Sequence, residues 1–172
     1  MPKCLQGDVL EQPDQLLIVF GRKGFNTMGA TWIAFATRNG LPIDEDPFRP
    51  DDIKPRAIGS DRFIATVAER KNHGIGDREL RDVFDRLIRW AHENGIRTIA
   101  TNGIADVNHG VGKEADRASD DRRAQMLIEL AKRYEDEFQV KITLANMDEV
   151  FVRQKPASRR HASGNSATNR FS

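Results

Sequence analysis

The chain has 172 residues, of which 38% are hydrophobic and 31% charged, with one cysteine and a formal net charge of +1. This length suits a single domain, because domains typically contain roughly 100–200 residues. The lone Cys4 excludes an internal disulfide and a cysteine-rich zinc site. No apolar run reaches the ~20 residues of a membrane-spanning helix, and the N-terminus lacks the layout of a signal peptide, so we expect a cytoplasmic protein without membrane contacts.

Basic residues gather at the end of the sequence. Residues 153–172 contain five arginines and lysines and no acid, which leaves a net charge of −4 on residues 1–152. A net negative charge on residues 1–152 is not typical of a general nucleic-acid binder, which carries a basic patch on its folded domain. Ser, Ala, Asn and Gly fill the rest of the segment, so we predict one domain at 1–152 and a disordered basic tail at 153–172. Contact of this tail with nucleic acid is a minor alternative.

The first half of the chain predicts three strands and one helix. Apolar runs indicate strands near 3–6, 16–20 and 62–68, and the unbroken run from Leu16 to Phe20 is typical of a strand buried on both faces. A helix is predicted at 29–39, ending at Gly40. The segment 41–60 contains four prolines, and its pattern assigns no element to it.

The second half alternates helix and strand. Between residues 77 and 94, apolar residues recur at helical spacing, with Asp77 as a candidate N-cap and Asn94-Gly95 as a helix end. A strand at 98–101, a helix at 120–137 and a strand at 140–144 follow, and 149–153 is a candidate edge strand. Strands separated by helices predict an α/β fold, a three-layer α/β/α sandwich with a mixed, largely parallel central sheet.

Two glycine-rich loops follow predicted strands. Residues 21–30 run directly into a helix, and residues 102–112 combine glycines with a carboxylate, amides and an imidazole. Ligands of open α/β sheets bind at the carboxyl ends of the strands, and a helix N-terminus with free N–H groups favours anions. The two loops therefore predict a phosphate-binding site, although a glycine loop can equally serve turn geometry alone.

The order of these parts resembles the macrodomain family. Gly7-Asp8-Val9-Leu10 is similar to the opening motif of that family, and Asn26 with Met28-Gly29-Ala30 is similar to its first loop and helix. The helix 81–92 with the strand after Gly95 resembles the long helix and the strand that feeds the phosphate loop. The segment 123–144 resembles the last helix and strand, so the likeness covers most of residues 4–144.

This resemblance implies a macrodomain-like sandwich that binds ADP-ribose or a derivative without a metal or other cofactor. Asp8, with Val9 beside it, would contact the adenine amino group, and Asn26 would lie near the distal ribose. The loops that would hold the diphosphate and ribose supply the remaining candidates, Gly24, Gly29, Ala30, Gly103, Ile104, Ala105, Asn108 and Gly110. From the residues alone, Asp8 could instead cap a turn, and Asn26 could occupy a left-handed position.

The second loop departs from the family pattern. Family members usually carry a proline and a dense run of glycines there, whereas this chain has Asn102 and the run from Asp106 to His109, and the loop extends to Ser119. A carboxylate near an imidazole can fix its tautomer and raise its basicity, so Asp106 and His109, together with Asn26, are candidate catalytic residues that activate water. They would hydrolyse ADP-ribose-1″-phosphate or remove ADP-ribose from a modified macromolecule.

Two other interpretations stay open. The domain could bind ADP-ribose or another nucleotide without turnover, or serve as a degenerate domain for protein contacts, and the altered phosphate loop favours this class. The chain could also belong to another nucleotide-processing α/β family such as the lysine-decarboxylase-like proteins. Such proteins normally show a denser glycine-rich signature late in the chain, which this sequence lacks.

Overall fold

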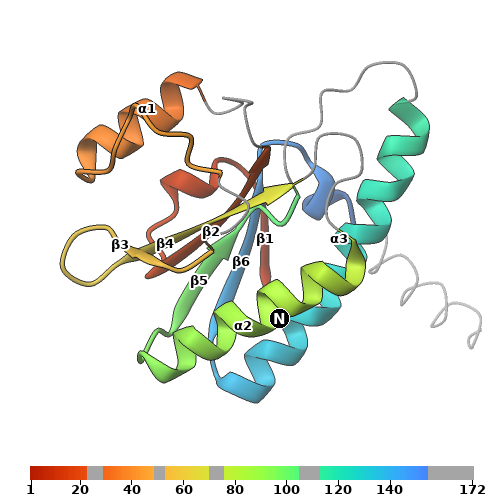
Figure 1. Ribbon diagram of the computed structural model, residues 1–172. Helices are drawn as coiled ribbons and strands as arrows, with labels where there is room; N and C mark the ends of the chain where they lie inside the picture. Colours follow the sequence, from red (N-terminus) through yellow and green to blue (C-terminus); the bar gives the residue numbers. More distant parts are fainter. Residues whose placement is uncertain (23–28, 49–52, 70–75, 105–112, 155–172) are drawn as a thin grey trace, which may run out of the picture.

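The computed structural model describes residues 1–22, 29–48, 53–69, 76–104 and 113–154, without the side chains of 22, 29–30 and 113–117 (Figure 1). Its six strands form one sheet in the order β1-β6-β5-β2-β4-β3. All neighbours pair in parallel except β3, which is antiparallel to β4, so the predicted mixed and largely parallel sheet is confirmed. The strands are β1 (Lys3–Gln6), β2 (Leu16–Arg22), β3 (Arg56–Ala57), β4 (Phe63–Glu69), β5 (Thr98–Thr101) and β6 (Lys141–Asn146).

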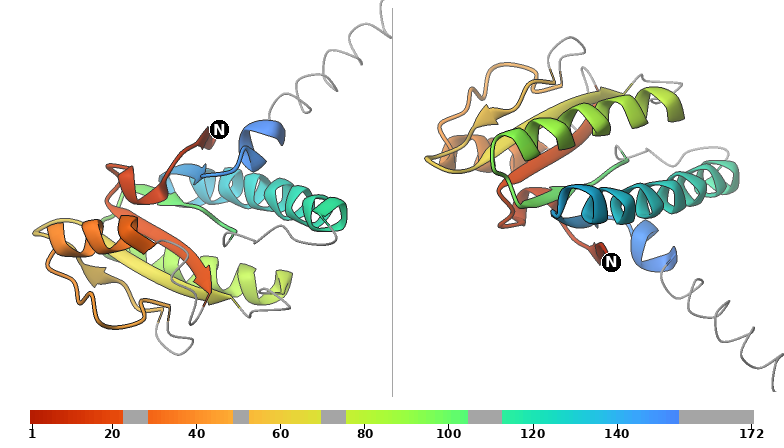
Figure 2. Two further views of the ribbon diagram at one scale, coloured as in Figure 1. Left: turned by 90° about the horizontal axis from the view of Figure 1, so that it is seen from above. Right: turned by 90° about the horizontal axis from the view of Figure 1, so that it is seen from below.

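Helices cover both faces of this sheet, as predicted (Figure 2). The helix α1 (Gly29–Arg38) and the 3-10 turn η1 (Val9–Glu11) pack on one face. The helices α2 (Asp77–Glu93) and α3 (Lys113–Phe138) lie side by side on the other. The chain therefore folds as a three-layer α/β sandwich.

The central strand β2 separates two hydrophobic cores. Leu16, Ile18 and Phe20 belong to the core under α2 and α3, whereas Leu17 and Val19 belong to the core under α1. All five side chains are at most 1% exposed. Because successive side chains of a strand point to opposite faces, a strand covered on both faces must be apolar throughout, which explains the unbroken apolar run.

The helix α2 matches its sequence pattern except at its first residue. Its apolar face is buried against the sheet, and Gly95 beyond its end has a φ of +71°. The predicted N-cap is wrong, since Gly76 occupies that position without a side-chain bond and Asp77 is the first helical residue. The Asp77 carboxylate instead forms an ion pair with Arg122 of α3, with Oδ2 at 3.1 Å from Nη1.

Two predicted boundaries need correction near the C-terminus. The helix α3 begins at Lys113 and not near 120, so the second glycine-rich loop ends before Lys113 and does not extend to Ser119. A helical segment at 150–154 replaces the expected edge strand. Because β6 already has β1 and β5 as neighbours, it has no free edge beside it for another strand. Val150 and Phe151 are buried in the core under α3 instead.

The proline-rich segment supplies part of the core under α1. Phe48 and Ile58 are 1% and 2% exposed and pack with Trp32, and the short strand β3 pairs with β4. The Phe48 ring lies against the backbone of Gly21, where a Cβ would approach its Cζ to 2.2 Å. Glycine at position 21 therefore allows the segment to lie close against β2.

Candidate functional site

The carboxyl ends of the five parallel strands meet at one rim of the sheet. β2 pairs directly with β5, with Ile18 opposite Thr101, so the two glycine-rich loops leave the rim from neighbouring strands. Asp8 follows the end of β1 at the same rim, two strands away from β5. The sheet thus brings together the start points of three segments that the sequence singled out.

Asn102 joins the two loop-bearing strands beyond the last backbone pair. Its Nδ2 donates to the carbonyl oxygen of Phe20 at 3.0 Å, and its Oδ1 accepts from the Phe20 N–H at 2.8 Å. The side chain is buried, with 8% exposure. One amide therefore satisfies both backbone groups of a residue in β2 and prolongs the pairing of β2 with the chain that follows β5.

A second buried asparagine fixes the same turn from the other side. Asn146, the last residue of β6, donates through Nδ2 to the carbonyl oxygens of Asn102 and Ile104 at 3.0 and 3.2 Å. Its Oδ1 accepts from the Asp148 N–H at 2.9 Å. These bonds hold the backbone at 102–104 in one conformation, since buried carbonyl groups are costly to leave unpaired.

Gly103 and Ile104 begin the second loop. Gly103 has a φ of +65°, and a Cβ there would lie 2.6 Å from Cδ1 of Leu127 in α3. Ile104 is 4% exposed in the core under α2 and α3, and its N–H donates to the Asn102 carbonyl at 2.7 Å. Because the Ile104 side chain is buried in the core, only the backbone of Ile104 could contact a ligand at the rim.

Asp8 caps the turn η1, as one interpretation of the sequence allowed. Its Oδ1 accepts from the Leu10 N–H at 2.9 Å. The Asp8 side chain makes no other hydrogen bond to the described part of the chain, so Oδ2 is available to a ligand. Val9 is 2% exposed and packs in the core under α1.

The remaining candidates cannot be located with side chains. Gly29 and Ala30 form the start of α1, of which only the backbone is described. The other predicted residues lie outside the described residues, namely Gly24, Asn26, Ala105, Asp106, Asn108, His109 and Gly110. Contact between Asp106 and His109 stays a prediction for that reason.

A buried ion pair lies where β4 ends at the rim. Arg123 of α3 donates through Nη1 to Oε1 of Glu69 at 2.6 Å, with the two side chains 16% and 4% exposed. Removing one partner of a buried pair leaves a poorly solvated charge, so the pair ties α3 firmly to the sheet. This pair therefore holds the end of β4 against α3 at the rim.

Sequence reasoning missed the roles of Asn102, Asn146, Glu69 and Arg123. Polar residues directly after an apolar strand, such as Asn102 and Glu69, were the available signal. The role of Asn146 was not predicted because the predicted strand stopped at residue 144.

No group of three or more His, Cys, Asp and Glu side chains that could bind a metal occurs in the described ranges. Among those same residues, no helix is long and apolar enough to cross a membrane.

No family model matches the sequence, and no curated protein does. Among solved structures, the macrodomain of Thermus aquaticus DarG is similar, with 15% identity and a TM-score of 0.49 over 85% of this chain and 97% of that chain. A mutant of tomato leucine aminopeptidase is similar with 10% identity and a TM-score of 0.47, over 86% of this chain and 33% of that chain. Likenesses at this level identify neither ligands nor residues.

Proposed function

We propose that the chain binds ADP-ribose, or a derivative of it, along the carboxyl rim of the sheet. The observation that supports this proposal is the order of the segments at the rim, with Asp8 after β1 and the two glycine-rich loops after the adjacent strands β5 and β2. Three strand spacings of about 4.8 Å separate β1 from β2, roughly 14 Å in all. An extended nucleotide diphosphate can span that distance.

Each end of the ligand meets a different kind of group in this arrangement. The Asp8 Oδ2 accepts a hydrogen bond from the adenine amino group, while Oδ1 holds the turn. In this proposal the diphosphate and distal ribose bind to the glycine-rich segments after β2 and β5 and to the N-terminus of α1, where free N–H groups and the helix dipole favour an anion. The frame of Asn102 and Asn146 fixes where the second loop begins.

Calorimetric titration with ADP-ribose tests this proposal. In Asp8→Asn, Oδ1 can still cap η1, but the amide would present N–H groups to the adenine amino group. Loss of a hydrogen bond to a charged group costs about 1.5–3 kcal/mol, so we expect binding to weaken by roughly 10- to 100-fold. Glu11→Gln changes a carboxylate in the same turn and should leave the affinity unchanged. Absence of binding to the native protein, or equal affinities for the two variants, would refute the proposal.

For catalysis, we propose that Asp106 and His109 activate water against the bound ligand, with Asn26 near the distal ribose. Incubation with ADP-ribose-1″-phosphate and with ADP-ribosylated protein or DNA tests for turnover. The double variant Asp106→Ala, His109→Ala should lose turnover and retain ADP-ribose binding. Unchanged turnover in this variant would remove the pair from the mechanism.

Binding without turnover on any of these substrates would favour a nucleotide reader. The feature of this chain that favours that alternative is the second loop, in which Asn102 and the run 106–109 replace the expected glycines. Binding of neither ADP-ribose nor its derivatives would leave protein contacts as the remaining class. The modified macromolecule and a cytoplasmic location stay predictions.

A further inference from the structure

Phe48 packs between the end of β2 and the start of α1, the two elements that residues 23–28 connect. The tip of its ring lies against the backbone of Gly21, the last residue but one of β2. The same ring packs with Trp32, in the first turn of α1, with the ring centroids 6.3 Å apart. Phe48 is 1% exposed, so its ring fills the space between the strand and the helix from inside the core.

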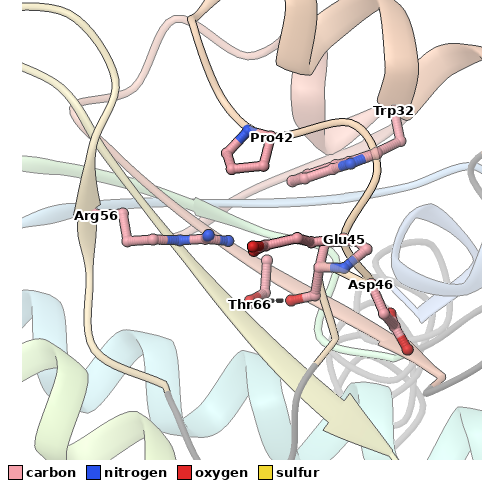
Figure 3. A pocket seen from close by; sticks show the side chains of 7 residues that line it. Trp32, Pro42, Glu45, Asp46, Arg56 and Thr66 are labelled. Atoms are coloured by element: carbon pink, nitrogen blue, oxygen red, sulfur yellow. Dashed lines mark hydrogen bonds between the residues drawn. The ribbon is translucent and has the colours of Figure 1, made fainter.

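The residues before Phe48 are held to the neighbouring strand. The hydroxyl of Thr66 in β4 donates to the carbonyl oxygen of Pro47 at 2.6 Å (Figure 3). The Phe48 N–H donates to Oδ1 of Asp46 at 2.9 Å, which closes a short turn. Because β4 pairs with β2, the backbone is anchored at one strand while the ring reaches the next. The place of the ring is therefore fixed relative to the sheet as well as to α1.

The packing beside Phe48 leaves room for movement. A cavity of 160 Å³ lies between α1, the proline-rich segment and β4, and its lining includes Trp32, Pro42, Arg56 and Thr66 (Figure 3). A core relaxes around a shortened side chain according to the space that its neighbours have. A smaller residue at position 48 would therefore allow α1 to shift relative to β2.

We propose that Phe48 is a positioning residue of the ADP-ribose site, an inference that rests on the function proposed above. By packing against both Gly21 and Trp32, it sets the separation between the end of β2 and the N-terminus of α1. An N–H···O hydrogen bond requires a donor–acceptor distance of about 2.7–3.2 Å, so donors on the two elements can bind one diphosphate only at a fixed separation. Phe48 acts through these elements and does not touch the ligand.

Calorimetric titration with ADP-ribose compares Phe48→Leu with Phe35→Leu. Phe35 is a matched control, because it is 2% exposed in the same core and also packs with Trp32. It lies six residues beyond the start of α1, about 9 Å along the helix. We expect roughly 10-fold weaker binding in Phe48→Leu, the effect of one lost charge-assisted hydrogen bond, and unchanged binding in Phe35→Leu. Urea unfolding verifies that both variants are folded during the titration.

A second substitution tests the contact with Gly21 itself. In Gly21→Ala the new Cβ would approach Cζ of Phe48 to 2.2 Å, so the ring must move, and binding should weaken by roughly 10-fold. Leucine has no Cε or Cζ, so Gly21→Ala should not weaken binding further in the Phe48→Leu background. Equal weakening by Gly21→Ala in both backgrounds, or equal affinities of Phe48→Leu and Phe35→Leu, would overturn the proposal.

Amide hydrogen exchange distinguishes a failure of this inference from a failure of the proposed function, because it needs no ligand. Phe48→Leu should accelerate exchange of the Ile33 and Ala34 amides, near the start of α1, more than Phe35→Leu does. This difference, without binding of ADP-ribose to the native protein, would refute the ligand and leave the control of α1 by Phe48 in place. Equal exchange in the two variants would overturn the positioning role whether or not ADP-ribose binds.

Discussion

Asn102 is the residue on which the geometry of the proposed site depends most. It holds a residue that lies 82 positions earlier in the chain, and it does so through both backbone groups of Phe20. Asparagine at this position therefore has a structural reason, because its side-chain amide continues the strand pairing where the backbone turns away.

Asn102→Ala should destabilise the fold by about 2–6 kcal/mol. The substitution leaves two buried backbone groups of Phe20 without partners, at about 1–3 kcal/mol each. Asn39→Ala is a suitable control, since it removes one partly buried bond, from Nδ2 to the Phe35 carbonyl. Urea unfolding measures both. Equal losses in the two variants would show that the Asn102 amide does not stabilise the rim in this way.

Asp14 predicts a pH dependence of stability. Burial raises the pKa of its carboxyl, and a backbone hydrogen bond and the charges of Lys3 and Arg62 oppose this shift only in part. The folded state therefore holds the proton at higher pH than the unfolded chain, whose aspartates titrate near about 3.9. The stability contributed by Asp14 is then complete below that pH and is lost as pH rises through the folded pKa.

Asp14→Asn removes this loss. We expect the variant to gain stability relative to the native protein as pH rises from about 4, and the gain to level off above the folded pKa. Urea unfolding of both proteins from acidic to neutral pH measures the difference. A difference that stays constant, or that favours the native protein increasingly toward neutral pH, would contradict the raised pKa.

At the scale of elements, Gly103 determines how closely α3 approaches the end of β5. Its φ of +65° favours glycine, and the Leu127 side chain occupies the space where a Cβ would lie. Gly40, after α1, has a nearly equal φ of +68° but nothing within 4 Å of the corresponding position. A comparison of substitutions at these two glycines therefore distinguishes the cost of the left-handed backbone, which both share, from the cost of steric contact, which only Gly103 has.

Gly40→Ala should cost about 1 kcal/mol, since only the left-handed backbone disfavours alanine there. Gly103→Ala should cost about 1–3 kcal/mol more, because the added methyl group overpacks the contact with Leu127. Thermal and urea unfolding of the two variants measure the difference. If Gly103→Ala costs no more than Gly40→Ala, then α3 can move away from the rim at little cost.

At the scale of the molecule, the folded domain extends past the predicted boundary at residue 152. Gln154 is 5% exposed and donates to Oδ1 of Asp121 at 2.7 Å, and Arg153 donates to the same oxygen through Nε at 3.0 Å. Gln125 also donates to Gln154, at 3.0 Å. These bonds fix the helical segment at 150–154 on α3. The rest of the predicted tail lies outside the described residues.

Truncation tests this boundary. A chain of residues 1–156 should unfold at the same urea concentration as the full-length protein. A chain of residues 1–152 should be less stable by about 2 kcal/mol, because it loses the charge-assisted bonds to Asp121. If both truncated chains match the full-length protein, the contacts at 153–154 contribute nothing, and if both are destabilised, the segment after 156 packs on the domain.

The fold could be predicted from the sequence where the pattern is local. The strands at 3–6 and 98–101 match the structure, and the helices at 29–38 and 77–93 end within one residue of their predicted ends. Apolar runs and helical spacing record which faces are buried, so they predict these elements and their alternation. The start of α3 was missed because its first residues are mostly polar and carry no apolar repeat.

By itself, the sequence determined a three-layer α/β fold, because the apolar periods and the alternation of strands and helices along the chain depend on neighbouring residues. The two glycine-rich loops as the place for a ligand stay a prediction. Only the tertiary structure decided that Asn102 binds Phe20, that Glu69 pairs with Arg123, and that Trp32 and Arg56 line one cavity. Each of these contacts joins segments far apart in the chain. Sequence spacing cannot indicate them, since they exist only after the strands have paired and the helices have packed.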